Sequence, residues 1–131
     1  MRRTLTAVLA VAALLPGAAP ANDELAMQQA MELFERGQYA QAAEHLRAAA
    51  DAGDARAAEI LGFMYGFGAS MFPGMSRDLR EADRWFDRAA RGGQPVGRYM
   101  VCALRRQTGA APHAPRRCFD WVAVTGQPAP R

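Results

Sequence analysis

The two cysteines carry the clearest chemistry in this sequence. Cys102 and Cys118 are separated by 15 residues and form neither a Cys-x-x-Cys pair nor a haem-attachment pattern. In an oxidising compartment two such cysteines pair by default. The bond would contribute on the order of 3 kcal/mol in the chain-entropy model. The sequence therefore predicts a Cys102–Cys118 disulfide in an exported chain.

The other reactive side chains form no catalytic or metal-binding pattern. His45 and His113 are not at metal-ligand spacing, and Ser76 lies in no nucleophile-elbow motif. The stretch Gly66–Gly68 has neither the preceding strand nor the following lysine of a phosphate loop. General acid–base catalysis needs two carboxylates that converge in a cleft, whereas the helical acids Glu32, Glu35, Glu44 and Glu59 occur at solvated spacing. We expect no catalytic residue, no metal site and no cofactor.

Residues 1–21 have the composition of a signal peptide. Two arginines precede a short apolar run, Leu5–Leu15, which is well below the roughly 20 residues needed to cross a bilayer. The small-x-small pattern that ends at Ala21 is typical of a cleavage site, and cleavage there avoids a proline at the new terminus. We expect Sec-type export to the periplasm or beyond, with no stable membrane insertion after cleavage.

The charge of the expected mature chain is nearly balanced. Removing 21 of the 131 residues leaves 110, enough for one modest domain, with 14 arginines, 13 acids and no lysine. The formal net charge of +3 for the whole chain is therefore no sign of nucleic-acid binding. The charge is uneven, because residues 22–60 hold eight acids and three arginines, whereas residues 105–131 hold five arginines and one acid.

Apolar residues at helical spacing predict five helices, at about residues 23–36, 39–52, 55–65, 79–91 and 95–107. Asn22 or Asp23, Asp54 and Asp78 are the expected N-caps, and Glu81 completes a capping-box pattern with Asp78. Glycines at positions 37, 53 and 93 are expected to end three of the helices.

One pattern occurs twice in the chain, at a constant offset of 40 residues. Ala42, Leu46, Ala49, Ala50, Gly53, Ala57 and Leu61 return as Ala82, Phe86, Ala89, Ala90, Gly93, Gly97 and Val101. A fixed period of roughly 20–50 residues indicates stacked helical hairpins, none of which can bury its apolar face alone. The repeated alanines favour close approach of neighbouring helices.

From Ala57 to Gly93 the sequence resembles a Sel1-like repeat, a relative of the tetratricopeptide repeats. The residues that match the family pattern are Ala57, Leu61, Gly62, Tyr65, Gly68, Asp78, Ala82, Trp85, Ala89, Ala90 and Gly93. The connecting loop is about four residues longer than in the family pattern, and the array stops after roughly two and a half repeats. The resemblance implies a right-handed superhelix of antiparallel helix pairs that is used for protein–protein contact.

The expected fold is therefore all-α: a short right-handed α-solenoid of about five helices over residues 22–107, followed by a disulfide-tethered Pro/Ala-rich tail over residues 108–131. An array of fewer than three repeats leaves an apolar end uncovered. We expect the last helix to expose Met100, Cys102 or Leu104. Residues 118–122 would fold back over that face as a cap, using Phe119, Trp121 and Val122. The alternative is a disordered tail that happens to contain aromatic residues.

Two surfaces are candidates for binding. The first is a groove along the first, third and fifth helices, to which we assign Glu32, Glu59, Phe63, Phe67, Arg98 and Arg105. The repeat core requires neither Phe63 nor Phe67, and aromatic and arginine side chains dominate binding hot spots, although Phe63 could instead pack under the long loop. The second surface is that loop, where Phe72 and Met75 are the candidates and Met71 takes the place of a core-facing residue in the family pattern.

These features favour a non-enzymatic interaction module of the bacterial cell envelope, monomeric or weakly self-associating, that binds a protein or peptide. One alternative is a periplasmic immunity or inhibitor protein that occupies the active site of a toxin. Another is a cell-wall hydrolase, which would need a nucleophile or convergent carboxylates in a cleft. A third is one piece of a larger assembly, in which end-to-end stacking completes the short array.

Overall fold

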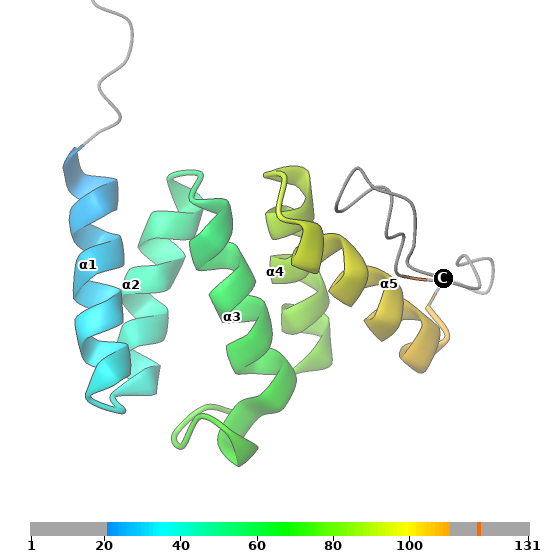
Figure 1. Cartoon of the computed structure of the whole chain (residues 1–131). Coiled ribbons are helices and arrows are strands. Elements are labelled where there is room, and N and C mark those ends of the chain that lie inside the picture. The colour runs from blue at the N-terminus through cyan, green and yellow to red at the C-terminus, as the bar shows by residue number, and fades with distance from the viewer. Residues whose placement is uncertain (1–20, 111–117, 119–131) are drawn as a thin grey trace, which may run out of the picture.

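The computed structural model describes residues 21–110 together with Cys118, and this part of the chain is helical without strands (Figure 1). Its elements are α1 (Ala21–Glu35), α2 (Tyr39–Asp51), α3 (Ala55–Phe67), the short 3-10 helix η1 (Gly68–Ser70), α4 (Leu79–Arg91) and α5 (Pro95–Thr108). The all-α prediction is confirmed. The expected signal peptide, except for Ala21, and the expected cap residues Phe119, Trp121 and Val122 lie outside the described residues.

The predicted helix bounds need two corrections. Helix α1 begins at Ala21, so Asn22 and Asp23 lie inside it and not before it. Helix α3 continues through Gly66 and Phe67, because glycine weakens a helix without forbidding it and the break comes only at Gly68, where φ is +54°.

The two aspartates expected to start α3 and α4 do cap them. The carboxylate of Asp54 accepts hydrogen bonds from Arg56 N at 2.8 Å and Ala57 N at 3.0 Å. Asp78 accepts in the same way from Arg80 N at 2.9 Å and Glu81 N at 3.1 Å. In a capping box the side chain of Glu81 would accept a hydrogen bond from the N–H of Asp78. Here that N–H donates instead to the carbonyl of Tyr65 at 2.9 Å. This bond joins the start of α4 to α3.

The forty-residue repeat is visible in the backbone hydrogen bonds of the turns. After α2, Gly53 N donates to Ala50 O at 3.0 Å and Asp54 N donates to Ala49 O at 3.0 Å. After α4, forty residues later, Gly93 N donates to Ala90 O at 3.1 Å and Gln94 N donates to Ala89 O at 3.0 Å. Both glycines have positive φ, +113° and +93°, as this type of helix ending requires. The two segments therefore leave their helices through the same turn.

The helices pack in chain order, each mainly against its neighbours, and lie side by side in a row (Figure 1). The repeated alanines form the seams between them: Ala42, Ala49, Ala57, Ala82 and Ala89 are 0% exposed. Gly97 likewise allows α5 to approach α4 closely, because an added Cβ would lie only 2.8 Å from the backbone N of Ala90. In the described part of the chain, neighbouring helices are therefore in contact through buried alanines. The right-handed sense of the superhelix stays a prediction.

Gly62 has a specific packing role at the α3–α4 contact. A Cβ at this position would lie 2.6 Å from Cδ1 and 2.7 Å from Cε1 of Phe86, whose ring is fully buried. The missing side chain lets the Phe86 ring lie directly against the backbone of α3. The ring fills the centre of the core between α3 and α4.

A disulfide joins Cys102 of α5 to Cys118, with the two Cα atoms 5.3 Å apart. The pairing is the one that the sequence predicts. The expected exposure of the last helix needs correction, because Leu104 is only 7% exposed. None of the described helices is long and apolar enough to cross a membrane.

Candidate functional site

A groove with a volume of ≈ 670 Å³ opens between α3, the loop after η1 and α5. Helix α4 contributes Leu79 and Phe86 to its lining. The other lining residues among those described are Phe63, Gly66, Phe67, Ala69, Ser70, Met75, Ser76, Arg77, Met100, Leu104 and Gln107. The volume falls in the range of about 300–1,000 Å³ that is usual for ligand sites.

Aromatic rings form the α3 side of the groove. Phe63 and Phe67, one helical turn apart, stack with their centroids 6.2 Å apart and an interplanar angle of 9°. Phe63 also meets the buried Phe86 ring edge-on, at 5.0 Å and 84°. Phe67 is 42% exposed, so the pair runs from the core to the surface. Its outer ring is available for contact with another molecule.

Helix α5 supplies the opposite side. Met100, Leu104 and Gln107 follow each other at helical spacing and all line the groove. Leu104 is buried, Met100 is half-buried and Gln107 is exposed, so this side changes from apolar to polar toward the end of the helix. Methionine is flexible and polarisable and therefore adapts to different apolar partners.

Polar groups lie at the edge of the groove formed by the loop. The Nε of Arg77 donates a hydrogen bond to the carbonyl of Gly66 at 3.1 Å, and the Ser70 hydroxyl donates to the carbonyl of Phe67 at 2.6 Å. These carbonyls belong to the last turn of α3, where a cation also interacts favourably with the helix dipole. Arg77 is exposed, and its two Nη groups make no hydrogen bond within the described part of the chain.

The groove brings together three of the eight residues proposed from the sequence: Phe63, Phe67 and Met75. The expectation that Met75 is an exposed loop residue is wrong, because it is 7% exposed and belongs to the core cluster. Met71 takes the exposed position instead, at 57%. The loop turns between them, with Met75 N donating to Phe72 O at 3.0 Å, and this turn exchanges the roles of the two methionines.

Phe72 lies away from the groove, in an aromatic cluster at the ends of α1 and α2. Its ring centroid is 5.7 Å from that of Phe34 and 5.3 Å from that of Tyr39. Phe72 is half-buried, so it fixes the long loop against the first helix pair. The sequence predicted Phe72 as a binding residue of the loop surface, whereas its ring contacts in the structure are with Phe34 and Tyr39 of the fold itself.

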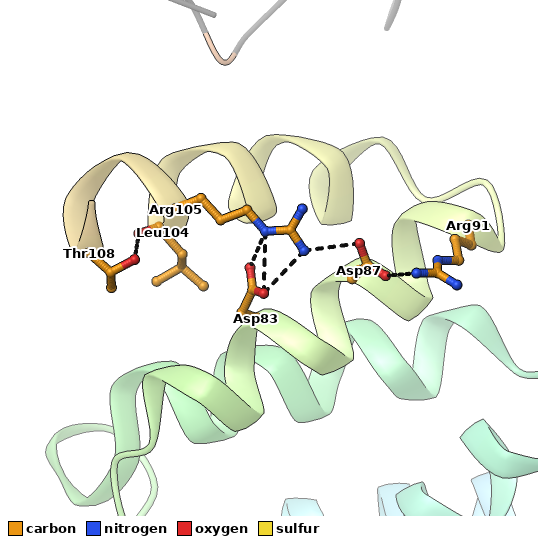
Figure 2. A network of polar contacts seen from close by, with 6 residues as sticks. All are labelled: Asp83, Asp87, Arg91, Leu104, Arg105 and Thr108. Carbon is orange, nitrogen blue, oxygen red and sulfur yellow. Dashed lines mark hydrogen bonds and ion pairs between the residues drawn. The ribbon is translucent and has the colours of Figure 1, made fainter. Parts of the chain in front are cut away.

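Arg105 faces α4, as Figure 2 shows. Its Nε lies 3.0 Å from Asp83 Oδ1, and its Nη2 lies 3.1 Å from Asp83 Oδ2 and 3.2 Å from Asp87 Oδ1. The hydrogen bond to Asp83 is the main cause that raises the pKa of Arg105, against a smaller opposing effect of burial. Arg105 therefore holds α5 to α4, which corrects its expected position along an open groove.

The same helix contact is made by a different pair in the preceding repeat. Forty residues before Asp87 and Arg105 stand Arg47 and Tyr65, and the Arg47 guanidinium donates a hydrogen bond to the Tyr65 hydroxyl. The arginine lies on opposite helices in the two pairs. The polar contact thus recurs at the same two positions of the repeat, but it is an arginine–tyrosine hydrogen bond in one case and an arginine–aspartate ion pair in the other.

The remaining sequence candidates are scattered. Glu32 is exposed on α1 and pairs with Arg36 at 2.5 Å. Glu59 lies one turn before Phe63 on α3, and its Oε2 is buried without a hydrogen-bond partner among the described residues. Arg98 is exposed on α5. None of the three is among the residues that line the groove.

Sequence reasoning missed the α5 side of the groove and its polar edge. Gln107 stands forty residues after Phe67, which also lines the groove, so the repeat offset gives a signal for Gln107; Met100 stands forty residues after Ile60, which does not line the groove, so the offset gives none for Met100. Arg77 carries no such signal, because it lies in the loop, where the period is interrupted. Among the described residues, no group of three or more His, Cys, Asp or Glu side chains is placed to hold a metal ion.

Comparison with family models, with curated proteins and with solved structures finds no match for this chain.

Proposed function

We propose that this protein is a non-enzymatic interaction module of the bacterial cell envelope, and that the groove between α3 and α5 binds a segment of a partner protein. The observation that carries the proposal is the stacked Phe63–Phe67 pair, which extends from the buried Phe86 ring to a 42% exposed outer ring. A rigid aromatic group of this kind, at the side of a preformed hollow, is the usual centre of a binding hot spot.

The envelope location and the family are part of the same proposal. The signal-peptide pattern of residues 1–21 supports export, and a disulfide between Cys102 and Cys118 is suited to an oxidising compartment. Membership of the Sel1-like repeats is supported by the shared turn after α2 and α4 and by the role of Gly62. In such arrays the surfaces between stacked helices are used for binding.

The lining of the groove defines the chemistry of the partner segment. Its lining is mainly apolar, whereas Arg77 and Ser76 stand at the edge formed by the loop and the exposed Gln107 stands at the end of α5. The Nε of Arg77 is used by Gly66 O, which fixes the guanidinium beside the groove and leaves its Nη groups for an anion. The segment that fits best has two large apolar side chains with a neighbouring acidic side chain, since arginine binds carboxylates through paired donors.

A selection experiment tests this proposal. A displayed library of random seven-residue peptides is selected on the oxidised chain, and the enriched peptides are synthesised and titrated by fluorescence anisotropy. We expect a consensus of two large apolar residues with a neighbouring Asp or Glu. Phe67→Ser should weaken binding roughly thirtyfold or more, since hot-spot truncations cost at least about 2 kcal/mol. Arg77→Gln should weaken only the peptides that contain the acid.

Met71→Ser is the matched control, because Met71 is an exposed apolar residue of the same region, at 57%, and does not line the groove. Its peptide affinity should equal that of the unchanged protein. Equal losses from Phe67→Ser and Met71→Ser would show that binding is not at the groove. Failure to enrich any apolar consensus would reject the proposed function.

A further inference from the structure

Helix α4 carries a stripe of arginines on its outer face. The second, third and fourth members follow the first by 4, 8 and 11 residues, which places all of them within about a quarter of the helix circumference. The members of this arginine stripe are Arg80, Arg84, Arg88 and Arg91, and all are exposed. Since a helix rises about 1.5 Å per residue, the stripe is about 17 Å long.

Helix α1 carries an acidic stripe with the same spacing of 4, 8 and 11 residues. Its members are Glu24, Gln28, Glu32 and Glu35, and all are exposed. Three of them are carboxylates, whereas Gln28 is neutral. Helix α1 lies at the end of the row of helices and packs mainly against α2 (Figure 1). The chain therefore has two stripes of equal length and opposite charge on two different helices.

The repeated fold requires neither stripe. The positions forty residues before the arginine stripe hold no arginine; they are Ala40, Glu44, Ala48 and Asp51. The positions forty residues after the acidic stripe hold no charged residue; they are Met64, Gly68, Phe72 and Met75. The matching spacing of the two stripes is therefore not a product of the forty-residue period.

Ion pairs within the chain leave the arginine stripe largely open. Arg84 pairs with Glu81 at 2.7 Å, yet its side chain stays 76% exposed. Arg91 pairs with Asp87 at 2.6 Å and stays 80% exposed. Arg80 makes no ion pair within the described part of the chain. Because a guanidinium has five N–H donors, each of these three arginines can bind a further carboxylate.

Arg88 is the member of the stripe with the most contacts inside the fold. Its Nη1 lies 2.6 Å from Asp51 Oδ1, and its guanidinium carbon lies 5.6 Å from the centroid of the Trp85 ring. These contacts hold Arg88 between α4 and the end of α2. Its charge is therefore already balanced within the chain.

We propose that the acidic stripe of one copy of this chain binds to the arginine stripe of a second copy, with the two helices antiparallel. Reading the stripes in opposite directions pairs Glu35 with Arg80, Glu32 with Arg84, Gln28 with Arg88 and Glu24 with Arg91. The positions agree to within one residue, or about 1.5 Å along the helix. The neutral Gln28 then faces Arg88, which Asp51 already neutralises.

The charges at the ends of the stripes favour the antiparallel direction. Glu35 is the last residue of α1 and Arg80 lies in the first turn of α4, so each charge stands at the end of its own helix that repels it. In the antiparallel contact, Glu35 lies beside the N-terminus of α4 and Arg80 lies beside the C-terminus of α1. Each charge then meets a helix end that attracts it.

The contact joins different surfaces of two identical chains, so it continues from copy to copy as an open chain or a closed ring. It differs from end-to-end stacking, in which α5 of one copy would meet α1 of the next. Neither stripe is among the described residues that line the groove. Each copy therefore keeps its groove accessible, and the assembly presents several grooves at once.

Sedimentation equilibrium of the oxidised chain tests the association. The weight-average mass should rise with protein concentration at about 20 mM salt and should stay that of the monomer at about 500 mM salt, because exposed ion pairs are weak and are screened by salt. A monomer mass at every concentration up to about 1 mM protein in low salt would overturn the proposal.

Two charge-reversed variants test the pairing of the stripes. The first is Arg80→Glu with Arg84→Glu, and the second is Glu32→Arg with Glu35→Arg. Each variant alone should self-associate roughly tenfold or more weakly, because two like-charge contacts replace two attractive ones. An equimolar mixture should recover the association of the unchanged protein, since the reversed residues of one variant face those of the other. A mixture that associates no more than its components would overturn the proposal.

Arg98→Glu is the matched control for Arg84→Glu alone, because it makes the same change of charge at an exposed position of α5, outside the stripe. Arg84→Glu should weaken self-association roughly threefold or more, whereas Arg98→Glu should leave it unchanged. Equal losses would show that net charge controls the association and would reject the proposal, as would association that survives in both double variants. No peptide takes part in these measurements, so their outcome is separate from that of the proposed function.

Discussion

Replacing Gly62 with alanine should destabilise the protein, although alanine is the better helix former. The added Cβ would lie 2.6–2.8 Å from three ring atoms of Phe86, whereas carbon atoms in ordinary contact are about 3.5–4.0 Å apart. The Phe86 ring would have to move by roughly 1 Å. The ring is fully buried and meets Phe63 at 5.0 Å, so its neighbours would have to move as well.

The magnitude follows from two opposing contributions. Overpacking a well-filled core costs about 1–3 kcal/mol. The change from glycine to alanine inside a helix returns up to about 1 kcal/mol. Because the Cβ would meet three atoms of a buried ring, we place the cost in the upper half of its range, and we expect Gly62→Ala to lower the free energy of unfolding by about 1–2 kcal/mol. For a domain of this size each kcal/mol corresponds to a Tm change of about 4–8 °C.

Gly66 of the same helix is the control for this prediction. A Cβ at Gly66 would meet only Ala82 Cβ, at an ordinary distance of 3.8 Å. Thermal unfolding of the oxidised chain, followed by circular dichroism, should therefore show a lower Tm for Gly62→Ala and an equal or higher Tm for Gly66→Ala. Phe86→Leu in the Gly62→Ala background should reduce the cost of the alanine. Equal Tm values for the two glycine variants, or no effect of Phe86→Leu on the cost, would refute the packing argument.

Two further predictions concern polar contacts. Arg105→Met should lower the free energy of unfolding in urea by about 1 kcal/mol, since the partly exposed Arg105 binds Asp83 and Asp87 together. Because the pKa of Arg105 is raised, its contribution to the free energy of unfolding is complete at every pH below the ordinary arginine value. The loss of stability in Arg105→Met should therefore be equal at about pH 6 and about pH 9. A loss that differs between the two pH values would contradict the role of the charge. Asp54→Ala and Asp78→Ala should each lower the free energy of unfolding by about 1 kcal/mol, measured by thermal unfolding. The two losses should add in the double variant, because the aspartates cap different helices. A loss near zero for either variant would show that its cap bonds are not stabilising.

The helices were predictable because each carries its own local signals. Asp54 and Asp78 mark the starts of α3 and α4, and the glycines at 53 and 93 end the preceding helices through the same turn. These signals act over a few residues and need no knowledge of the rest of the fold. The boundary at the end of α3 was misplaced, since Gly66 and Gly68 look equivalent in the sequence and only Gly68 adopts positive φ.

The groove was predictable only on its α3 side. Phe63 and Phe67 stood out as aromatic residues that the repeat core does not require, and both line the groove. The positions of Met71, Met75 and Arg105 depend on where the long loop turns and on how α5 crosses α4. Those are long-range properties, which no periodic pattern in the loop or in a single helix encodes. The exchange of Met71 and Met75 follows from one irregular turn after η1.

Packing in chain order has a mechanical consequence for the molecule. The main contacts of α1 are with α2, and those of α5 are with α4 and α3, so strain at one end must pass through each intermediate helix before it reaches the other. The array should therefore bend through small shifts at each contact between neighbouring helices. The groove beside Phe67 lies near the disulfide-bearing helix α5, so bending of the acidic first helix should displace it little.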